Sequence, residues 1–197
     1  MSKRNKIDVE TLVSAYCQGF FPMPDEQSGK ILWYNPDPRA IIPLESFHTS
    51  HSLRKILKKN IFSISINQRF ADVLELCADR PETWINDEIK QSYFELHVFG
   101  LAHSVEVLLD GKLVGGVYGV AINAAFFAES MFSKVSNASK VALYYLVERL
   151  NTQNFQLLEV QFLTPHLQSL GAEAISRDLY LEKLRRALKK KTNFVNS

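Results

Sequence analysis

The sequence has few cysteines, no long apolar run and almost no net charge, and each shortage excludes a class of protein. Cys17 and Cys77 are its two cysteines, and neither forms a CxxC or CxxxH pattern, so we expect reduced thiols and no metal site. No run of about 18 apolar residues is present, which excludes a membrane-spanning helix. The polar first residues carry no secretion signal, so we expect a cytoplasmic protein. A net charge of +2 is too small by itself to indicate nucleic-acid binding.

The residues that are present fit a folded globular protein. The chain has 197 residues, of which 46% are apolar and 22% charged, and these values are typical of one domain, with or without a small appendage. Its 13 phenylalanines and 7 tyrosines predict a core or a pocket that is rich in aromatic rings.

Residues 1–45 predict a small lobe at the N-terminus. Asp8 can cap a short helix whose apolar face contains Leu12 and Tyr16, and Gly19 can end that helix. Prolines then exclude regular helix, and two X-Pro steps close together enforce extended or turn geometry. Large apolar side chains are too frequent in this segment for a solvated linker.

Residues 46–197 predict a second, larger unit in which helices and strands alternate. An Asp-Gly pair at 110–111, between two segments of alternating polarity, indicates a β-hairpin. This succession predicts an α+β fold in which a mixed sheet is flanked by helices. The expected helices are 52–59, 68–78, 87–99, a segment that follows Asn137-Ala-Ser-Lys140 and ends at about Leu150, and 177–190, and the expected strands are 61–66, 103–109, 113–120, 124–127 and 157–163.

Five stretches carry more information than composition and periodicity do. In their order along the chain, from about Val9 to Tyr180, they resemble the leucyl/phenylalanyl-tRNA–protein transferases. Each stretch alone is a weak signal, whereas their succession over nearly the whole chain is specific. The stretches are Trp33-Tyr-Asn-Pro-Asp-Pro-Arg39, Thr83-Trp84-Ile85, Gly100-Leu-Ala-His-Ser-Val-Glu-Val107, the block from Leu113 to Lys140 that contains Glu-Ser-Met-Phe-Ser and Asn-Ala-Ser-Lys, and Glu159-Val-Gln161 with His166-Leu-Gln-Ser-Leu-Gly-Ala172.

The resemblance implies a fold, a reaction and a set of partners. Members of the family are similar in fold to acetyltransferases of the GNAT class, with a small N-terminal lobe in front. They move leucine, or phenylalanine and methionine, from an aminoacyl-tRNA to a protein whose N-terminal residue is arginine or lysine, and the product enters a degradation pathway. We therefore expect an aminoacyltransferase that needs no cofactor and that holds these two substrates as a monomer.

The sequence departs from the family's pattern in three places. It lacks the Gly-Gly-Asp-Leu-Ser segment that members usually carry near the N-terminus. Met23 stands where the pattern has a tryptophan, which bears on one aromatic wall for the terminal adenine. Glu159 stands where the pattern has aspartate, which keeps the charge on a longer side chain and bears on the choice of acceptor.

The reaction needs few catalytic groups, because the donor ester is already activated and the acceptor amine is a nucleophile once it is neutral. Strand alternation places Glu159 and Gln161 on the same face. From the resemblance we expect Gln161 to position the amine or to donate to the oxyanion, and Glu159 to orient Gln161. We expect Glu129 and Glu159 to bind the basic side chain of the acceptor. Without the resemblance, the pattern fits a buried glutamine and two surface acids equally well.

The resemblance also implies a donor site. Its apolar pocket would hold leucine or phenylalanine, and a methionine in it can adapt to several side chains. The expected stacking residue for the terminal adenosine is Trp84, with Tyr16 and Tyr93 nearby. Taken singly, each of these side chains also fits an ordinary core. The expected pocket residues are Val117, Phe126, Met131, Leu146, Leu150 and Leu158.

Basic residues gather on two predicted helices, where they are candidates for phosphate contacts. Arg54, Lys55, Lys58 and Lys59 lie on the first, and we expect them to bind the acceptor stem of tRNA because the family's helix there is also basic. The basic residues of the last helix fit a solvated face equally well.

Other functions stay open on sequence grounds. An acetyl-CoA-dependent N-acetyltransferase on the same scaffold would carry an Arg/Gln-x-x-Gly-x-Gly/Ala turn before a helix, and no such string occurs. A non-catalytic tRNA-binding module would need the basic faces but not Glu129, Glu159 and Gln161. A peptidoglycan-building aminoacyltransferase is disfavoured, because those chains are usually longer.

Overall fold

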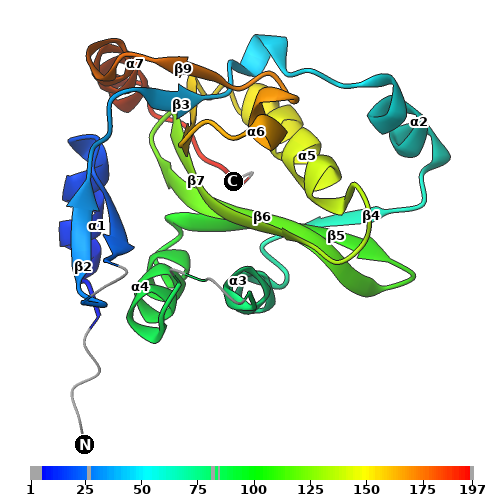
Figure 1. Ribbon diagram of the computed structural model, residues 1–197, viewed down its shortest axis with the longest axis horizontal. Helices are drawn as coiled ribbons and strands as arrows, with labels where there is room; N and C mark the ends of the chain where they lie inside the picture. The colour runs from blue at the N-terminus through cyan, green and yellow to red at the C-terminus, as the bar shows by residue number, and fades with distance from the viewer. Residues whose placement is uncertain (1–5, 26–27, 81–82, 84, 196–197) are drawn as a thin grey trace, which may run out of the picture.

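A seven-stranded sheet forms the centre of the computed structural model, which describes residues 6–25, 28–80, 83 and 85–195. The strand order is β4-β5-β6-β7-β8-β3-β9, and all neighbours are antiparallel except β7 and β8, which are parallel (Figure 1). The predicted α+β fold with a mixed sheet is therefore confirmed. The strands are β3 (Arg39–Ile41), β4 (Ser63–Ile66), β5 (Ala102–Leu109), β6 (Lys112–Ile122), β7 (Ala125–Ser133), β8 (Leu157–Gln161) and β9 (Glu173–Ile175).

Helices cover both faces of this sheet, as predicted: α3 and α4 lie against one face and α5 against the other (Figure 1). Side chains of α1 and α7 share a hydrophobic cluster with α3 and α4, whereas α2 packs in a second cluster with α5. Among the described helices, none combines the length and the apolar character needed to cross a membrane. The helices are α1 (Val9–Cys17), η1 (Leu44–Ser46), α2 (His51–Lys59), α3 (Phe70–Ala78), α4 (Asp87–Val98), α5 (Ala138–Thr152), α6 (Pro165–Gln168) and α7 (Arg177–Lys189).

Short polar side chains fix the ends of several elements. Asp8 caps α1 by accepting a hydrogen bond from the Thr11 backbone N–H at 2.8 Å, as predicted. Ser50 caps α2 in the same way. The turn between β5 and β6 has φ values of 49° at Asp110 and 75° at Gly111, the left-handed values that a two-residue hairpin turn needs. The predicted hairpin is thus confirmed.

The N-terminal segment contributes a separate two-stranded sheet. Its strands are β1 (Phe21–Pro24) and β2 (Ile31–Tyr34), which lie beside α1 at one end of the molecule (Figure 1). The next strand, β3, joins the large sheet between β8 and β9 and carries Arg39 into the core, although it lies within the range predicted as the small lobe. The division of the chain at residue 45 stays a prediction.

The structure differs from the predicted elements mainly in strand extent. β7 continues to Ser133, well beyond the predicted end at Phe127, because a bulge inside the strand breaks the polar–apolar alternation on which the prediction depends. The short elements β1, β9 and α6 contain too few residues to show a period. The strand extension matters for function, since it carries Glu129.

Candidate active site

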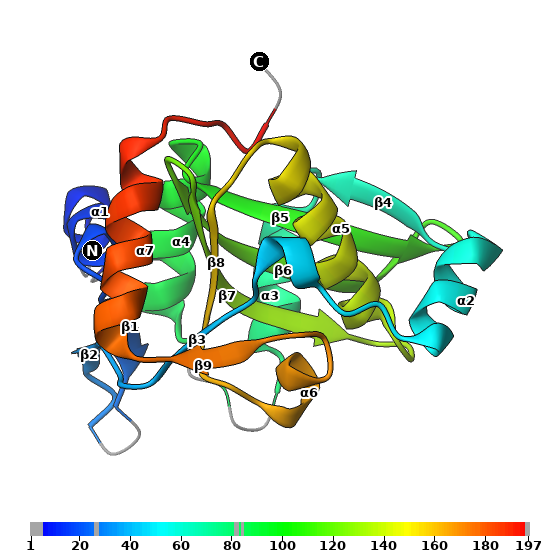
Figure 2. The same ribbon diagram turned by 90° about the horizontal axis from the view of Figure 1, so that it is seen from above.

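A gap opens where the parallel strands β7 and β8 diverge. They pair only over residues 125–127 and 157–159, and then separate, as the view from above shows (Figure 2). Phe127 is in register with Glu159. Glu129 and Gln161 therefore occupy the next equivalent positions on the two strands, just beyond the last pairing.

Glu129 is the extra residue of a β-bulge between β6 and β7. Tyr118 pairs with Ser130 and Gly119 pairs with Ala128, which leaves Glu129 without a partner on β6. A bulge takes a side chain out of the regular alternation of a strand and is frequent next to active sites. Here the bulge directs the carboxylate towards the end of β8.

Replacing Gly119 by alanine is expected to lower the free energy of unfolding by about 3 kcal/mol, because the bulge has no room for a Cβ atom. That atom would lie 2.2 Å from the Phe127 carbonyl oxygen and 2.5 Å from the Phe126 ring. Denaturant unfolding measures the change. Gly111→Ala is the control, since nothing lies within 4 Å of its Cβ position and only its left-handed backbone costs about 1 kcal/mol. Equal losses in the two variants would contradict the packing argument.

Gln161 ends β8 in an uncommon backbone conformation. Its φ is 63°, a left-handed value that residues other than glycine and asparagine rarely adopt. The register between β8 and β3 shifts beside it: Ala40 pairs with Gln161 and Ile41 with Glu159, so Val160 has no partner on β3. Irregular strand geometry thus lies on both sides of the gap, and such irregularities cluster at functional sites.

Glu129 accepts the hydrogen bonds of a largely buried network. Its Oε1 accepts from the Tyr16 hydroxyl at 2.7 Å, and its Oε2 accepts from the Tyr93 hydroxyl and from Gln161 Nε2, both at 3.0 Å. The two tyrosine hydroxyl oxygens are also in contact, and because each hydroxyl has one hydrogen, a hydrogen bond between them requires that Glu129 is protonated and donates in turn. Glu129 is 6% exposed and Gln161 8%, so both residues are buried without being fully closed off from solvent.

Burial, together with the nearby charge of Glu159, raises the pKa of Glu129 from 4.5 to about 8, against the hydrogen bonds from Tyr16, Tyr93 and Gln161 that lower it. A carboxyl group with this pKa exchanges its proton near neutral pH. The α-amino group of a protein has a pKa of about 8 as well. A proton can therefore pass between such an amine and Glu129 at little cost in free energy.

Glu159 forms a fully buried ion pair with Arg39. Arg39 Nε lies 2.7 Å from Glu159 Oε1, and both side chains are 0% exposed. The guanidinium also donates to the Gly19 carbonyl oxygen at 2.8 Å and lies 4.4 Å from the centre of the Tyr180 ring. Glu159 Oε1 accepts a further hydrogen bond, at 2.5 Å, from the Gln161 backbone N–H. The ion pair therefore fixes the backbone at the end of β8. The sequence does not predict Arg39 as a residue of the site.

Three predicted site residues have surroundings that differ from those expected. Glu159 is predicted as half of an acceptor-binding pair, but its carboxylate is fully buried and already paired with Arg39. Tyr16 and Tyr93 are predicted near the adenosine, but both are 0% exposed and their hydroxyls bind the carboxylate of the bulge. Neither ring offers a face to a base in this structure. Instead, Tyr16 and Tyr93 bind the carboxylate of Glu129, and Glu159 binds the backbone of Gln161.

A cavity of about 220 Å³ opens beside Glu129. It is smaller than the roughly 300–1,000 Å³ of sites that enclose a whole small ligand, so it suits one apolar side chain. Two of the predicted pocket residues, Val117 and Met131, line it, and Leu143, Val160 and Leu167 complete its apolar wall without having been predicted. The full lining is Arg80, Val117, Ala128, Glu129, Ser130, Met131, Leu143, Val160, Thr164 and Leu167.

The other four predicted pocket residues lie deeper in the core. Phe126, Leu146, Leu150 and Leu158 are each at most 1% exposed, and they do not line the cavity. They belong to the same hydrophobic cluster as its apolar wall. Phe126 packs against Phe194 from the end of the chain, with ring centres 5.3 Å apart. These residues support the cavity from behind.

The remaining predictions concern nucleic acid and metals. Arg54, Lys55, Lys58 and Lys59 are all exposed on α2, whose Leu53 is buried. Trp84, the residue predicted to stack on the adenosine, lies outside the described residues. Within the described ranges, no three histidine, cysteine or acidic side chains come together as a metal site would require.

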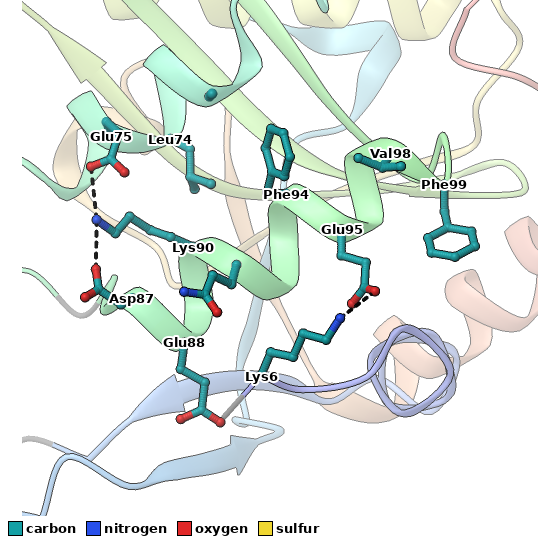
Figure 3. Close-up of a pocket in the computed structure, with 12 residues that line it drawn as sticks. Lys6, Leu74, Glu75, Asp87, Glu88, Lys90, Phe94, Glu95, Val98 and Phe99 are labelled. Carbon is teal, nitrogen blue, oxygen red and sulfur yellow. Dashed lines mark hydrogen bonds and ion pairs between the residues drawn. The ribbon is translucent and has the colours of Figure 1, made fainter. Parts of the chain in front are cut away.

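A larger hollow of about 940 Å³ runs along α4 and the facing side of α3 (Figure 3). Its charges are mostly paired with one another. Lys90 lies 3.0 Å from both Glu75 and Asp87, and Lys6 lies 2.7 Å from Glu95. The hollow is lined by none of the residues predicted for the site. The smaller cavity beside the bulge is therefore the candidate active site.

Two family models match the chain. The model described as leucyl/phenylalanyl-tRNA protein transferase matches residues 41–185, and that of the N-terminal domain of the same family matches residues 5–37. A leucyl/phenylalanyl-tRNA–protein transferase of Ruegeria sp. is 49% identical over 191 residues, which cover 96% of this chain and 91% of that relative. The transferase of the same name from Herpetosiphon aurantiacus is 48% identical, over 98% of this chain and 100% of the relative.

Among solved structures, L-PGS from Bacillus licheniformis aligns with a TM-score of 0.44 at 14% identity, over 84% of this chain and 56% of its own. A conserved protein from Bacteroides thetaiotaomicron aligns with a TM-score of 0.42 at 15% identity, over 87% of this chain and 58% of its own. Similarity at this level supports no argument about function.

Proposed function

The chain belongs to the leucyl/phenylalanyl-tRNA–protein transferase family, and we propose that it moves leucine, and also phenylalanine or methionine, from aminoacyl-tRNA to proteins that begin with arginine or lysine. The protein is thus an enzyme, an aminoacyltransferase. Its product enters a degradation pathway, as is the role of this family. We place the reaction in the cytoplasm and assign it to a monomer.

The observation that carries the proposal is the contact between Gln161 and Glu129 beside an apolar cavity. The transfer needs a place for one apolar side chain, a donor for the developing oxyanion and a group that handles the amine proton. These three parts meet where β7 and β8 diverge. No covalent intermediate on the enzyme is required, because the ester is already activated.

In the donor complex, the leucine side chain occupies the cavity between Val117, Met131 and Leu143. Such a pocket selects apolar over polar side chains more strongly than it separates leucine, methionine and phenylalanine, since one methylene is worth only about 1–3 kcal/mol. The ester carbonyl then lies near Gln161. One N–H of Gln161 Nε2 is bound to Glu129, and the other has no partner in the described part of the chain. That N–H is the oxyanion donor.

Glu129 binds the α-ammonium group of the acceptor and takes one proton from it. The neutral amine attacks the ester carbon, a C–N bond forms and the carbonyl electron pair moves onto oxygen, where Gln161 stabilises it. The C–O bond to the terminal ribose then breaks. The leaving ribose oxygen takes the remaining extra proton of the nitrogen, and an amide results. A basic first residue of the acceptor is favoured because Glu129 is the acid of this cavity.

The buried residues around the site act as positioning residues in this proposal. Tyr16 and Tyr93 hold the carboxylate of Glu129, and Arg39 holds Gln161 through Glu159. Glu159 therefore acts on the reaction through Gln161 and not by binding the acceptor side chain.

The exposed cations of α2, Arg54, Lys55, Lys58 and Lys59, give a sequence-independent attraction for the acceptor stem of the tRNA. We assign the stacking of the terminal adenosine to Trp84, because stacking on an aromatic ring is worth about 1–3 kcal/mol per base. This assignment rests on the family's motif.

A transfer assay read by mass spectrometry tests the proposal. The purified protein is mixed with leucyl-tRNA and three peptides that differ only in their first residue, which is arginine, aspartate or alanine. A parallel reaction contains acetyl-CoA in place of the tRNA. The expected result is a mass gain of one leucine on the arginine peptide and no acetylation.

Two outcomes would contradict the proposal. A leucine gain on the aspartate peptide would keep the reaction class but overturn the role of Glu129 in attracting a basic acceptor. Acetylation without any leucine transfer would mean that the protein is an acetyl-CoA-dependent N-acetyltransferase.

A further inference from the structure

Two further hollows continue the cavity along the surface. The first, of about 330 Å³, shares Arg80 and Met131 with the cavity beside Glu129. The second, of about 450 Å³, shares Leu76 and Lys134 with the first and ends at the β5–β6 hairpin. Each hollow thus shares side chains with the next, and Leu76 of α3 lines both of the further hollows. We call these two hollows together the α3 groove.

The α3 groove has an excess of unpaired cations. Arg69 is paired with Asp72 at 2.7 Å, and Glu75 is paired with Lys90 outside the groove at 3.0 Å. Three cations of the groove, Arg80, Lys134 and Lys112, form no ion pair within the described part of the chain. Against them stands one acid without an ion pair in the described residues, Asp79.

Arg80 is fixed at the point where the α3 groove meets the cavity. Its Nε donates to the Cys77 carbonyl oxygen at 3.0 Å, and its Nη2 donates to Ser130 Oγ at 2.9 Å and to the Met131 carbonyl oxygen at 2.8 Å. The Nη1 donors have no partner among the described residues. The guanidinium is thus held through Nε and Nη2, is exposed, and forms no ion pair with any of the described residues. Such a group is suited to bind a phosphate.

We propose that the α3 groove binds the phosphodiester backbone at the 3′ end of the donor tRNA, with Arg80, Lys134 and Lys112 as its phosphate contacts. This inference rests on the proposed function, since it presumes that the ester in the cavity belongs to a tRNA. The β5–β6 hairpin, which lines one end of the groove, lies at the same end of the molecule as the basic helix α2, although α3 and α2 are on opposite sides of the sheet (Figure 1). A tRNA with its single-stranded end in the groove therefore reaches α2 with its stem only around this end of the sheet.

Donors with and without phosphates test the proposal. Leucyl transfer to an arginine peptide is measured with leucyl-adenosine, which has no phosphate, and with a leucyl trinucleotide, which has two internal phosphates. Arg80→Ala is expected to raise the KM for the trinucleotide donor on the order of tenfold, the value of a lost charged hydrogen bond. Arg80 also lines the cavity, so this variant is not expected to leave transfer from leucyl-adenosine unchanged. Lys134→Ala, whose side chain makes no hydrogen bond in the described residues and does not line the cavity, should likewise raise the KM for the trinucleotide donor and should change the KM for leucyl-adenosine less than twofold.

Salt dependence gives a second readout. Each lost phosphate contact should reduce the slope of log affinity against log salt by about 0.7 for a single strand. Arg80→Lys keeps the charge, so it should retain the slope while losing the fixed hydrogen bonds. Lys30→Ala is the control, because Lys30 is an exposed cation on the β1–β2 hairpin, at the opposite end of the molecule (Figure 1). It should change neither KM nor the slope.

Three results would overturn the proposal. Equal losses with both donors in Lys134→Ala would show that the loss does not come from a phosphate contact. No loss with the trinucleotide would show that the α3 groove does not bind its phosphates. If the wild-type protein transfers leucine from no donor, the proposed function fails. Fluorescence anisotropy of the trinucleotide without leucine then still tests whether the α3 groove binds phosphates. Unchanged binding by Arg80→Ala and Lys134→Ala would refute that proposal.

Discussion

Replacing Glu129 by glutamine is expected to lower kcat/KM for leucyl transfer by about 10²–10⁴-fold, the range found for general acid–base groups. The amide keeps the size of the side chain and an oxygen that can accept a hydrogen bond from Tyr16 or Gln161. It cannot take the proton of the acceptor ammonium. Single-turnover transfer from leucyl-tRNA to an arginine peptide measures the loss.

Two variants define what this loss means. Glu129→Asp retains an ionisable carboxyl group, one methylene shorter, and should recover part of the activity. Glu106→Gln is the matched control, because Glu106 is another buried glutamate of the sheet, which accepts its hydrogen bonds from Ser65 and Ser104, away from the cavity. It should transfer leucine at the wild-type rate. A Glu129→Gln variant with activity within tenfold of the wild type would contradict the proposed role.

The stability of the Glu129→Gln variant separates function from folding. The pKa of Glu129 is raised by burial to about 8, so the folded protein binds this proton more tightly than the unfolded chain, in which the pKa is near 4.5. The contribution of this group to stability is therefore full below about pH 4.5 and is lost as pH rises through about 8, at about 1.4 kcal/mol per pH unit. Glu129→Gln removes this part of the pH dependence and should be at least as stable as the wild type at pH 8.

Replacing Arg39 by alanine is expected to lower the free energy of unfolding by about 3–5 kcal/mol, because it leaves the carboxylate of Glu159 buried without a cation. Both side chains are 0% exposed, so water cannot replace the lost partner. The Gln161 backbone would also lose a firmly held acceptor. Denaturant unfolding measures the stability, and the transfer assay measures the activity of the fraction that stays folded.

An exposed ion pair and a double variant are the controls for Arg39. Arg69→Ala breaks the Arg69–Asp72 pair, whose side chains are 40% and 51% exposed, and should cost less than about 1 kcal/mol. Arg39→Ala combined with Glu159→Gln removes the unpaired charge and should recover part of the stability. It should not recover activity, since Gln161 is no longer held. Equal costs for Arg39→Ala and Arg69→Ala would contradict the account of the buried pair.

The fold could be predicted from the sequence where local pattern determines structure. The Asp8 cap, the Asp-Gly turn and the alternation in β5 and β6 each depend on residues that are close in the chain. β1, β9 and α6 could not be predicted in this way, because their few residues show no period and their positions depend on pairing with distant segments. The length of β7 cannot be predicted for a related reason, since its bulge interrupts the alternation.

The candidate site was predictable in part. Strand alternation and the family's motifs identified Gln161, Glu159 and Glu129, and the structure brings the three onto adjoining strands. Their division of roles could not be predicted, because it depends on Arg39, which lies far from Glu159 in the sequence and meets it only through the pairing of β3 with β8. A buried cation partner leaves no periodic signal.

Long-range contacts also explain the tyrosines and the pocket. Tyr16 lies on α1 and Tyr93 on α4, two helices that are far apart in the sequence, and both hydroxyls bind Glu129 in the bulge. Nothing in the residues near them indicates that their hydroxyls bind a carboxylate. The apolar side chains were predicted as one group because spacing alone cannot separate the lining of a cavity, such as Val117, from the packed core behind it, such as Leu146.

A crystal structure with a stable leucyl-adenosine amide tests the central claim most directly. The account predicts the leucine side chain in the cavity between Val117, Met131 and Leu143, with the carbonyl oxygen within hydrogen-bond distance of Gln161 Nε2. The nitrogen and the carbonyl group of the leucine would then lie next to the carboxylate of Glu129. A ligand bound in the hollow between α3 and α4, with the cavity beside Glu129 empty, would contradict the account.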